Sequence, residues 1–282
     1  MRHPVITALA AALVLGACST VPDTDAVDRG VDGVNVVDET GLNDVMLTVG
    51  DPNEAVSYFQ RALTDAPDRI DHARGLALSL VRAGRIPEAR TAWEDVTARP
   101  DATDEDRVRL AGTLIRAGDW AEAEAVLDAI PPTHETHRRY RLEAMVADFN
   151  AEWDRADSFY EVAAGLTDTP AGTLNNWGYS KLTRGEHAEA ERLFHDALRL
   201  DPGLFTAKNN LVKALAAQGD YGLPVVPMTQ EERAQLLHTA GLAAVKRGDV
   251  VLGQGLLREA LETHPRHFEA AARALDALRS GG

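Results

Sequence analysis

Apolar side chains recur at helical spacing along most of this chain. In residues 188–200 the apolar positions lie three or four residues apart and would form one stripe on a helix: Ala190, Leu193, Phe194, Ala197 and Leu198. Such a stripe needs a neighbouring element to cover it, because a single helix cannot bury its own apolar face. The pattern therefore predicts an all-α protein in which consecutive helices pack on one another.

The helical pattern repeats with a period of about 34 residues. Turn residues mark the period at Gly50, Gly84, Gly118, Ala151, Gly185 and Gly219, with Ala151 where a glycine is expected. In most copies a small residue follows five positions later and a large apolar residue nine positions later. Glycine can adopt the turn that ends a helix, and small residues let two helices approach closely. Each period is therefore expected to be a helix–turn–helix unit that shares its core with its neighbours.

The segment NNWGYSKLTRGEHAEAERLFHDALRLDP is similar to a tetratricopeptide repeat (TPR). The resemblance covers residues 36–278, with a degenerate first helix at 40–49 and a capping helix at 268–278. It implies a right-handed superhelix, a solenoid of TPR helix pairs in which the first helix of each pair lines a concave groove.

Residues 219–228, GDYGLPVVPM, depart from the repeat. They begin like the other turns, but Pro224 and Pro227 exclude the helix that should follow. The apolar side chains are expected to lie extended over the surface that the missing helix would have covered: Leu223, Val225, Val226 and Met228. The alternative is an interaction site or a pivot for the last repeat. Thr229 and Glu232 have the spacing of a capping box, which predicts the start of the next helix.

The family resemblance assigns groove positions to the first helix of each pair. These positions carry seven basic side chains and three acidic ones, Asp71, Glu105 and Asp148, a balance of +4 in a chain with a formal net charge of −15. We expect an extended peptide with acidic residues or a free carboxylate to bind there, because Arg and Lys pair with carboxylates and Asn holds a peptide backbone. The alternative is that these residues are solvated helix charges that face acidic residues of neighbouring repeats. The candidate groove residues are Arg74, Arg82, Arg116, Arg138, Arg141, Asn175, Asn176, Tyr179, Asn209, Asn210, Lys213 and Lys246.

Charge and motifs exclude several other functions. The net charge of −15 and a pI near 5.0 argue against nucleic acid as a partner. Two histidine pairs, His134 with His137 and His264 with His267, lack a third ligand at helical spacing, so no metal is expected. The sequence contains no phosphate loop, nucleophile elbow or HExxH helix, which indicates a non-enzymatic protein without a cofactor. The tryptophans fall on positions that pack one helix against the next: Trp93, Trp120, Trp153 and Trp177.

The first eighteen residues have the composition of a targeting segment. Arg2 gives a positive start, residues 5–15 are almost entirely apolar, and the quartet LGAC ends at Cys18, the only cysteine. The quartet resembles a bacterial lipobox, which implies cleavage before Cys18 and lipidation of that residue. The alternative is a secretory signal with an incidental cysteine. Ser19 follows the cysteine, and the absence of an aspartate there favours the outer membrane.

The predicted organisation has five parts. A lipoprotein signal peptide at 1–17 precedes an acidic flexible tether at 18–35, rich in Asp and Gly. TPR repeats occupy 36–218, an extended joint follows at 219–228, and a final repeat with a capping helix spans 229–282.

The combination of lipobox, acidic tether and repeats that close with LLREALETHPRHFEAAARALDAL resembles the TadD-like lipoproteins of tight-adherence (Flp) pilus assembly. The resemblance implies a scaffold on the periplasmic face of the outer membrane that binds envelope or pilus-secretion components, such as a secretin, through its groove. The alternative is an adaptor for outer-membrane protein assembly or for cell-wall hydrolases.

Overall fold

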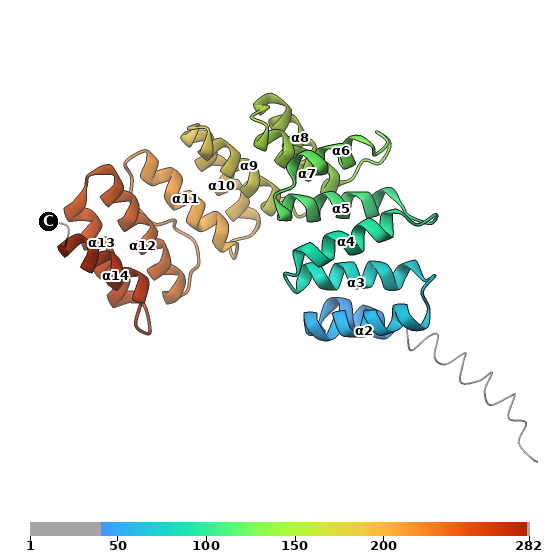
Figure 1. The fold of residues 1–282 in the computed structure, drawn as a ribbon. Coiled ribbons are helices and arrows are strands. Elements are labelled where there is room, and N and C mark those ends of the chain that lie inside the picture. The colour runs from blue at the N-terminus through green and yellow to red at the C-terminus, as the bar shows by residue number, and fades with distance from the viewer. Residues whose placement is uncertain (1–40, 281–282) are drawn as a thin grey trace, which may run out of the picture.

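The computed structural model of the chain describes residues 41–280, which form a succession of helices arranged along an arch (Figure 1). Residues 41–48 are helical, and no strand occurs between residues 41 and 280, so the predicted all-α class is confirmed there. The predicted signal peptide, Cys18 and the tether lie outside the described residues. The helices are α2 Pro52–Asp65, α3 Ile70–Arg82, α4 Ile86–Thr97, α5 Asp104–Ala117, α6 Trp120–Asp128, α7 His137–Phe149, α8 Trp153–Gly165, α9 Ala171–Thr183, α10 His187–Leu200, α11 Phe205–Ala217, α12 Gln230–Arg247, α13 Val250–Thr263 and α14 Glu269–Ser280.

The turns inside the helix pairs use left-handed backbone, as the 34-residue series predicts. Five turn glycines have φ between 71° and 99°: Gly84, Gly118, Gly185, Gly219 and Gly248. Ala151 has φ of 58° and is the only non-glycine residue with positive φ between residues 41 and 280. An alanine in this region is strained, so the rest of the repeat imposes the turn. Gly50 differs from the series, because it ends the degenerate first helix without positive φ.

The small and large positions of the repeat form the core. The small residues five positions after the turns are fully buried: Ala55, Ala89, Ala123, Ala156 and Ala190. The large residues nine positions after the turns are at most 2% exposed: Phe59, Trp93, Leu127, Tyr160, Phe194 and Leu257. At Gly178 a Cβ atom would come within 2.7 Å of the Phe194 ring, so this contact requires glycine. Stacked helix pairs therefore bury a series of apolar clusters along the chain.

Residues 218–229 join α11 to α12 without a helix, and the predicted capping box of Thr229 and Glu232 starts α12. The segment packs its apolar side chains on both neighbouring repeats: Leu223, Val226 and Met228. The expectation for Val225 was wrong, since this side chain is fully exposed. The amide of Val226 donates to the carbonyl of Pro224 at 3.0 Å, and this tight turn directs Val225 to solvent.

A buried lysine holds this joint in place. The Lys208 side chain is 2% exposed, and its Nζ donates to the Pro227 carbonyl at 2.7 Å and pairs with Glu232 at 3.2 Å. A buried ammonium group is costly unless it is paired and hydrogen-bonded, so these contacts fix the joint against α11. None of the helices between residues 41 and 280 has the length and apolar character needed to cross a bilayer.

Candidate binding groove

Six of the twelve predicted groove residues line two neighbouring pockets: Arg116, Arg138, Arg141, Asn175, Asn176 and Tyr179. The first pocket lies between α3, α5 and α7. Its volume of about 70 Å³ is large enough for a small group such as a carboxylate. We call it the arginine pocket. Its four arginines surround an apolar floor that includes Leu78, Val108 and Leu142. The arginines are Arg109, Arg116, Arg138 and Arg141.

Arg141 is the group in the arginine pocket that lacks a partner. Its Nε atom is buried without a hydrogen-bond partner, and no carboxylate between residues 41 and 280 forms an ion pair with it. Burial lowers the pKa of the Arg141 guanidinium, and the charges of Arg138 and Arg116 lower it further. A guanidinium stays protonated even so, and the pocket therefore contains a half-buried positive charge that no carboxylate of residues 41–280 neutralises.

Two of the other three arginines, Arg109 and Arg138, share one carboxylate. Glu105 pairs with the Nε of Arg109 at 3.1 Å and lies 3.5 Å from the Nε of Arg138. Arg116 donates to the Gly112 carbonyl of its own helix at 2.9 Å, which neutralises no charge. Burial lowers the pKa of Arg109, and the charge of Arg138 adds to the effect. Four cations beside one carboxylate give the pocket a net positive charge.

Arg74 and Arg82, which the same reasoning placed in the groove, are engaged in contacts between repeats. Arg74 donates two hydrogen bonds to the buried carboxylate of Asp106, at 2.8 and 2.6 Å. Arg82 donates to the carbonyls of Met46 and Gly50 at 2.7 and 2.8 Å, which caps the first helical segment. Arg74 therefore faces an acidic residue of the neighbouring repeat, as in the alternative, whereas Arg82 faces backbone carbonyls, which neither reading predicted.

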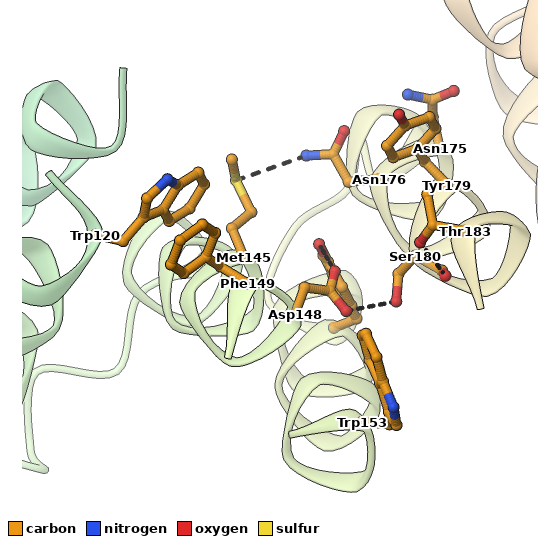
Figure 2. A pocket seen from close by; sticks show the side chains of 11 residues that line it. Trp120, Met145, Asp148, Phe149, Trp153, Asn175, Asn176, Tyr179, Ser180 and Thr183 are labelled. Carbon is orange, nitrogen blue, oxygen red and sulfur yellow. Dashed lines mark hydrogen bonds between the residues drawn. The ribbon is translucent and has the colours of Figure 1, made fainter. Parts of the chain in front are cut away.

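The second pocket lies between α6, α7, α8 and α9 and has a volume of about 340 Å³ (Figure 2). We call it the aromatic pocket. The rings of Trp120 and Phe149 stack at one side, with centroids 4.6 Å apart and planes within 7°. Phe149 is 60% exposed and Tyr179 is 51% exposed, which is unusual for rings of this size. The pocket is lined by Trp120, Met145, Asp148, Phe149, Trp153, Tyr160, Asn175, Asn176, Tyr179, Ser180 and Thr183.

Asp148 lies at the base of the aromatic pocket, as Figure 2 shows. Its carboxylate accepts hydrogen bonds from the Ser180 hydroxyl at 2.5 Å and from the Tyr160 hydroxyl at 2.8 Å. Burial raises the pKa of Asp148 above its usual value, although the two hydroxyl groups act in the opposite direction. Burial also raises the pKa of Tyr160, and the carboxylate beside it adds to this shift.

The predicted asparagines form a ladder from α9 to α12. Asn210 donates to the side-chain oxygen of Asn175 at 3.1 Å, and Lys213 lies 3.4 Å from the Asn210 oxygen. Asn209 accepts from the Thr239 hydroxyl at 2.8 Å. These contacts position the amides and leave donor and acceptor capacity for a peptide backbone, because an amide group can make up to four hydrogen bonds.

Several pocket residues were missed by the sequence reasoning, and one predicted residue lies apart. Arg109 follows a groove position by one residue, and Trp120 was expected to pack helices together rather than to stack on a ligand. Trp153, Tyr160 and Ser180 also line the aromatic pocket without having been proposed. Lys246 is exposed on α12 and lines neither pocket.

The histidines take part in contacts of other kinds. The Nε2 of His137 lies 2.8 Å from the Thr173 hydroxyl, and the ring of His264 stacks on Phe268 with centroids 4.9 Å apart. Within residues 41–280 no three His, Cys, Asp or Glu side chains converge in a way that could hold a metal ion.

Comparison with known families identifies the repeat. The tetratricopeptide repeat model matches residues 46–105 and 175–223, so these two stretches are similar to tetratricopeptide repeats. Both include groove helices described above, α3 in the first stretch and α11 in the second. No curated protein matches the chain.

Solved structures share the fold at low sequence identity. A chain of the APC/C hetero-tetramer Cut9–Hcn1 is 14% identical with a TM-score of 0.60, and the match covers 83% of this chain and 47% of that chain. A tetratricopeptide repeat protein from Parabacteroides merdae is 12% identical with a TM-score of 0.57, covering 84% and 95%. A thermophilic TPR protein of Thermus thermophilus is 19% identical with a TM-score of 0.54, covering 62% and 95%. This chain thus spans about half the length of the Cut9–Hcn1 chain, and these similarities show the fold alone.

Proposed function

We propose that this protein is a non-enzymatic TPR scaffold that binds an acidic segment of a partner protein in its arginine pocket. Proteins built from these repeats are generally scaffolds for protein–protein interaction. The observation that carries the proposal is the buried, unpartnered Nε of Arg141 among three further arginines.

A carboxylate from a partner would supply what the pocket lacks. Charge-assisted hydrogen bonds between guanidinium and carboxylate are among the strongest in proteins, and a guanidinium can bind both oxygens at once. Because the Nε of Arg141 is already buried in the folded state, a carboxylate that binds it causes no further desolvation of that atom. The asparagine ladder of α9 and α11 would hold the backbone of the same segment.

The setting of this scaffold is also a proposal. It rests on the resemblance of the quartet ending at Cys18 to a lipobox and of the whole chain to the TadD-like lipoproteins. The protein would be lipid-anchored through Cys18 on the periplasmic face of the outer membrane and would bind components of Tad/Flp pilus assembly or secretion, including a secretin. Recovery with the barrel-insertion machinery or with cell-wall hydrolases would instead support the alternative adaptor role.

Affinity purification of the full chain tests the arginine pocket. The double variant Arg138→Glu, Arg141→Glu places two carboxylates where the partner's carboxylate would lie, so co-purified partners should be lost. The matched control is Arg199→Glu, since Arg199 is 73% exposed on α10 and is paired with Asp196 of its own helix. If the double variant retains its partners at the level of the wild type, the proposal is wrong.

The lipid anchor has a separate test. Metabolic labelling with palmitate should mark the wild-type chain and leave Cys18→Ala unlabelled, since Cys18 is the only cysteine. Equal labelling of both chains, or of neither, would contradict the anchor and would leave the proposal for the arginine pocket unaffected.

A further inference from the structure

We propose that the aromatic pocket binds the cationic side chain of a lysine or arginine from the partner polypeptide. The inference concerns a second position in the same groove, and it rests on the proposed function in that the cation belongs to a protein partner. Three features carry it: the aromatic walls, the acidic base, and the ion pairs that hold the neighbouring cations away from the pocket.

The walls of the pocket are suited to a cation. In Figure 2 Phe149 and Met145 lie on one side and Tyr179 with Asn176 on the other, with Asp148 and Ser180 between them. The face of an aromatic ring carries partial negative charge and attracts ammonium and guanidinium groups within about 6 Å of the ring centre. The two most exposed rings of the pocket, Phe149 and Tyr179, therefore present surface that a cation can contact.

The base of the pocket carries an acid without an ion pair, on which the charge of Arg184 acts without direct contact. Asp148 accepts hydrogen bonds from Ser180 and Tyr160 only, and no Lys or Arg between residues 41 and 280 forms an ion pair with it. The two hydroxyl groups stabilise the carboxylate without neutralising its charge. A guest with a positive charge would neutralise Asp148, whereas an apolar guest would bury it more deeply.

The nearest cations are directed elsewhere. Lys181 and Arg184, which follow Ser180 on the same turn of the chain, both pair with Asp157 on α8, the former at 2.8 Å. Trp177 donates its indole N–H to the same carboxylate at 2.6 Å. Because Asp157 engages these three donors, Asp148 is left facing the pocket.

The position of the pocket predicts a spacing in the partner. Arg141 and Asp148 lie seven residues apart on α7, about 10 Å along a helix at 1.5 Å per residue. An extended peptide advances about 3.3 Å per residue. A partner that reaches both sites would therefore carry its basic residue about three positions away from its acidic residue.

Titration with single amino-acid amides tests the cation without involving the arginine pocket. The probes are Nα-acetyl-lysine amide, which keeps its side-chain ammonium group, and its neutral counterpart Nα-acetyl-norleucine amide. The signal is the indole N–H resonance of Trp120 in the full chain. We expect the lysine probe to bind about fivefold more tightly than the norleucine probe. Asp148→Asn removes the charge and keeps one oxygen that can accept from Ser180 or Tyr160, and it should bring the two probes to equal affinity. Asp154→Asn, an exposed aspartate of α8 outside the pocket, is the matched control.

Two results would overturn the inference: a norleucine probe that binds as well as lysine, or lysine binding that survives Asp148→Asn. Phe149→Leu should also weaken the lysine probe about fivefold, since it removes the ring and keeps an apolar side chain. The double variant Arg138→Glu, Arg141→Glu should not weaken binding of the lysine probe, because the added carboxylates can only favour a cation. Failure of the cation site and failure of the arginine pocket are therefore distinguished by separate variants.

Discussion

Arg74 on α3 and Arg141 on α7 occupy the same position of the repeat, ten residues before their turn residues Gly84 and Ala151, yet they differ in surroundings. Arg74 makes two hydrogen bonds to the buried carboxylate of Asp106, which lies 32 residues later on the next groove helix. The residue 32 positions after Arg141 is Thr173, which is buried and contacts His137 instead. A single difference in the neighbouring repeat, Asp106 against Thr173, thus accompanies the change from the paired Arg74 to the unpartnered Arg141.

The difference shows what a repeat position does and does not determine. Periodicity places a side chain on a given face of a given helix, because the backbone geometry is the same in each unit. The charge that this side chain meets depends on a single residue of the next unit, where Asp106 and Thr173 are not interchangeable. Each variant that follows changes either a cation or a residue that faces one.

The largest effect on stability is expected from Arg74→Ala. It leaves the Asp106 carboxylate, whose side chain is 3% exposed, without its cation, which costs about 3 kcal/mol of unfolding free energy. Arg141→Ala at the equivalent position should cost less than about 1 kcal/mol, because it removes a buried charge that has no partner. Urea unfolding followed by circular dichroism measures both. Similar losses for the two variants would show that the two arginines are not structurally distinct.

Lys208→Met extends the comparison to a lysine that is buried and, like Arg74, has partners. It removes the hydrogen bond to the Pro227 carbonyl and the ion pair with Glu232, and a loss of about 2 kcal/mol is expected. Because the joint connects α11 to the last repeat, amide hydrogen exchange should accelerate in α12 to α14 more than in α3 to α5. Uniform acceleration along the chain would contradict a local role for this lysine.

Thr173→Asp should give Arg141 on α7 the kind of ion pair that Arg74 on α3 makes with Asp106. An aspartate at this position would face Arg141 as Asp106 faces Arg74, and the pocket would lose its unpartnered charge. Binding of a glutamate-rich peptide should fall about tenfold, while the unfolding free energy changes by less than about 1 kcal/mol. Thr173→Val, which adds no charge, is the control, and an equal loss of binding in Thr173→Val would show that shape rather than charge is responsible.

The sequence predicted the features that depend on local backbone and period. The series of turn residues located the left-handed Ala151 as well as the glycines, and the Thr229 to Glu232 spacing located the start of α12. The groove positions likewise fell on the helices that line both pockets.

What the sequence left open depends on contacts between repeats. The groove positions alone did not separate Arg74 from Arg141. The sequence did contain the difference, because the residue 32 positions later is Asp106 in one case and Thr173 in the other. Trp120 was assigned to helix packing because residues at its repeat position pack helices together in other repeats. Here it stacks on Phe149 at the edge of a pocket. Val225 was misplaced because a tight turn after Pro224 breaks the alternation of an extended strand.

The smallest expected effect is a pH dependence of stability at Asp106. Burial alone would raise its pKa, but the hydrogen bonds from Arg74 and Thr103 prevail and hold the pKa below its usual value. A carboxyl group whose pKa is lowered by folding stabilises the fold above its unfolded pKa of about 3.9, and this contribution is lost as the pH falls through the folded pKa. Between about pH 5 and pH 2 the wild type should therefore lose stability more steeply than Asp106→Asn. Parallel pH profiles would contradict the shift.

The most direct test of the account is the response of the arginine side chains to a carboxylate ligand. The Nε–Hε resonances of Arg74 and Arg141 in the ¹⁵N-labelled full chain report on the paired and the unpartnered guanidinium in one titration with a glutamate-rich peptide. The account predicts a saturable shift of the Arg141 resonance, no shift of the Arg74 resonance, and loss of the Arg141 response in Thr173→Asp. An Arg141 resonance that stays fixed while the peptide binds, or that moves no more than that of Arg74, would contradict the account.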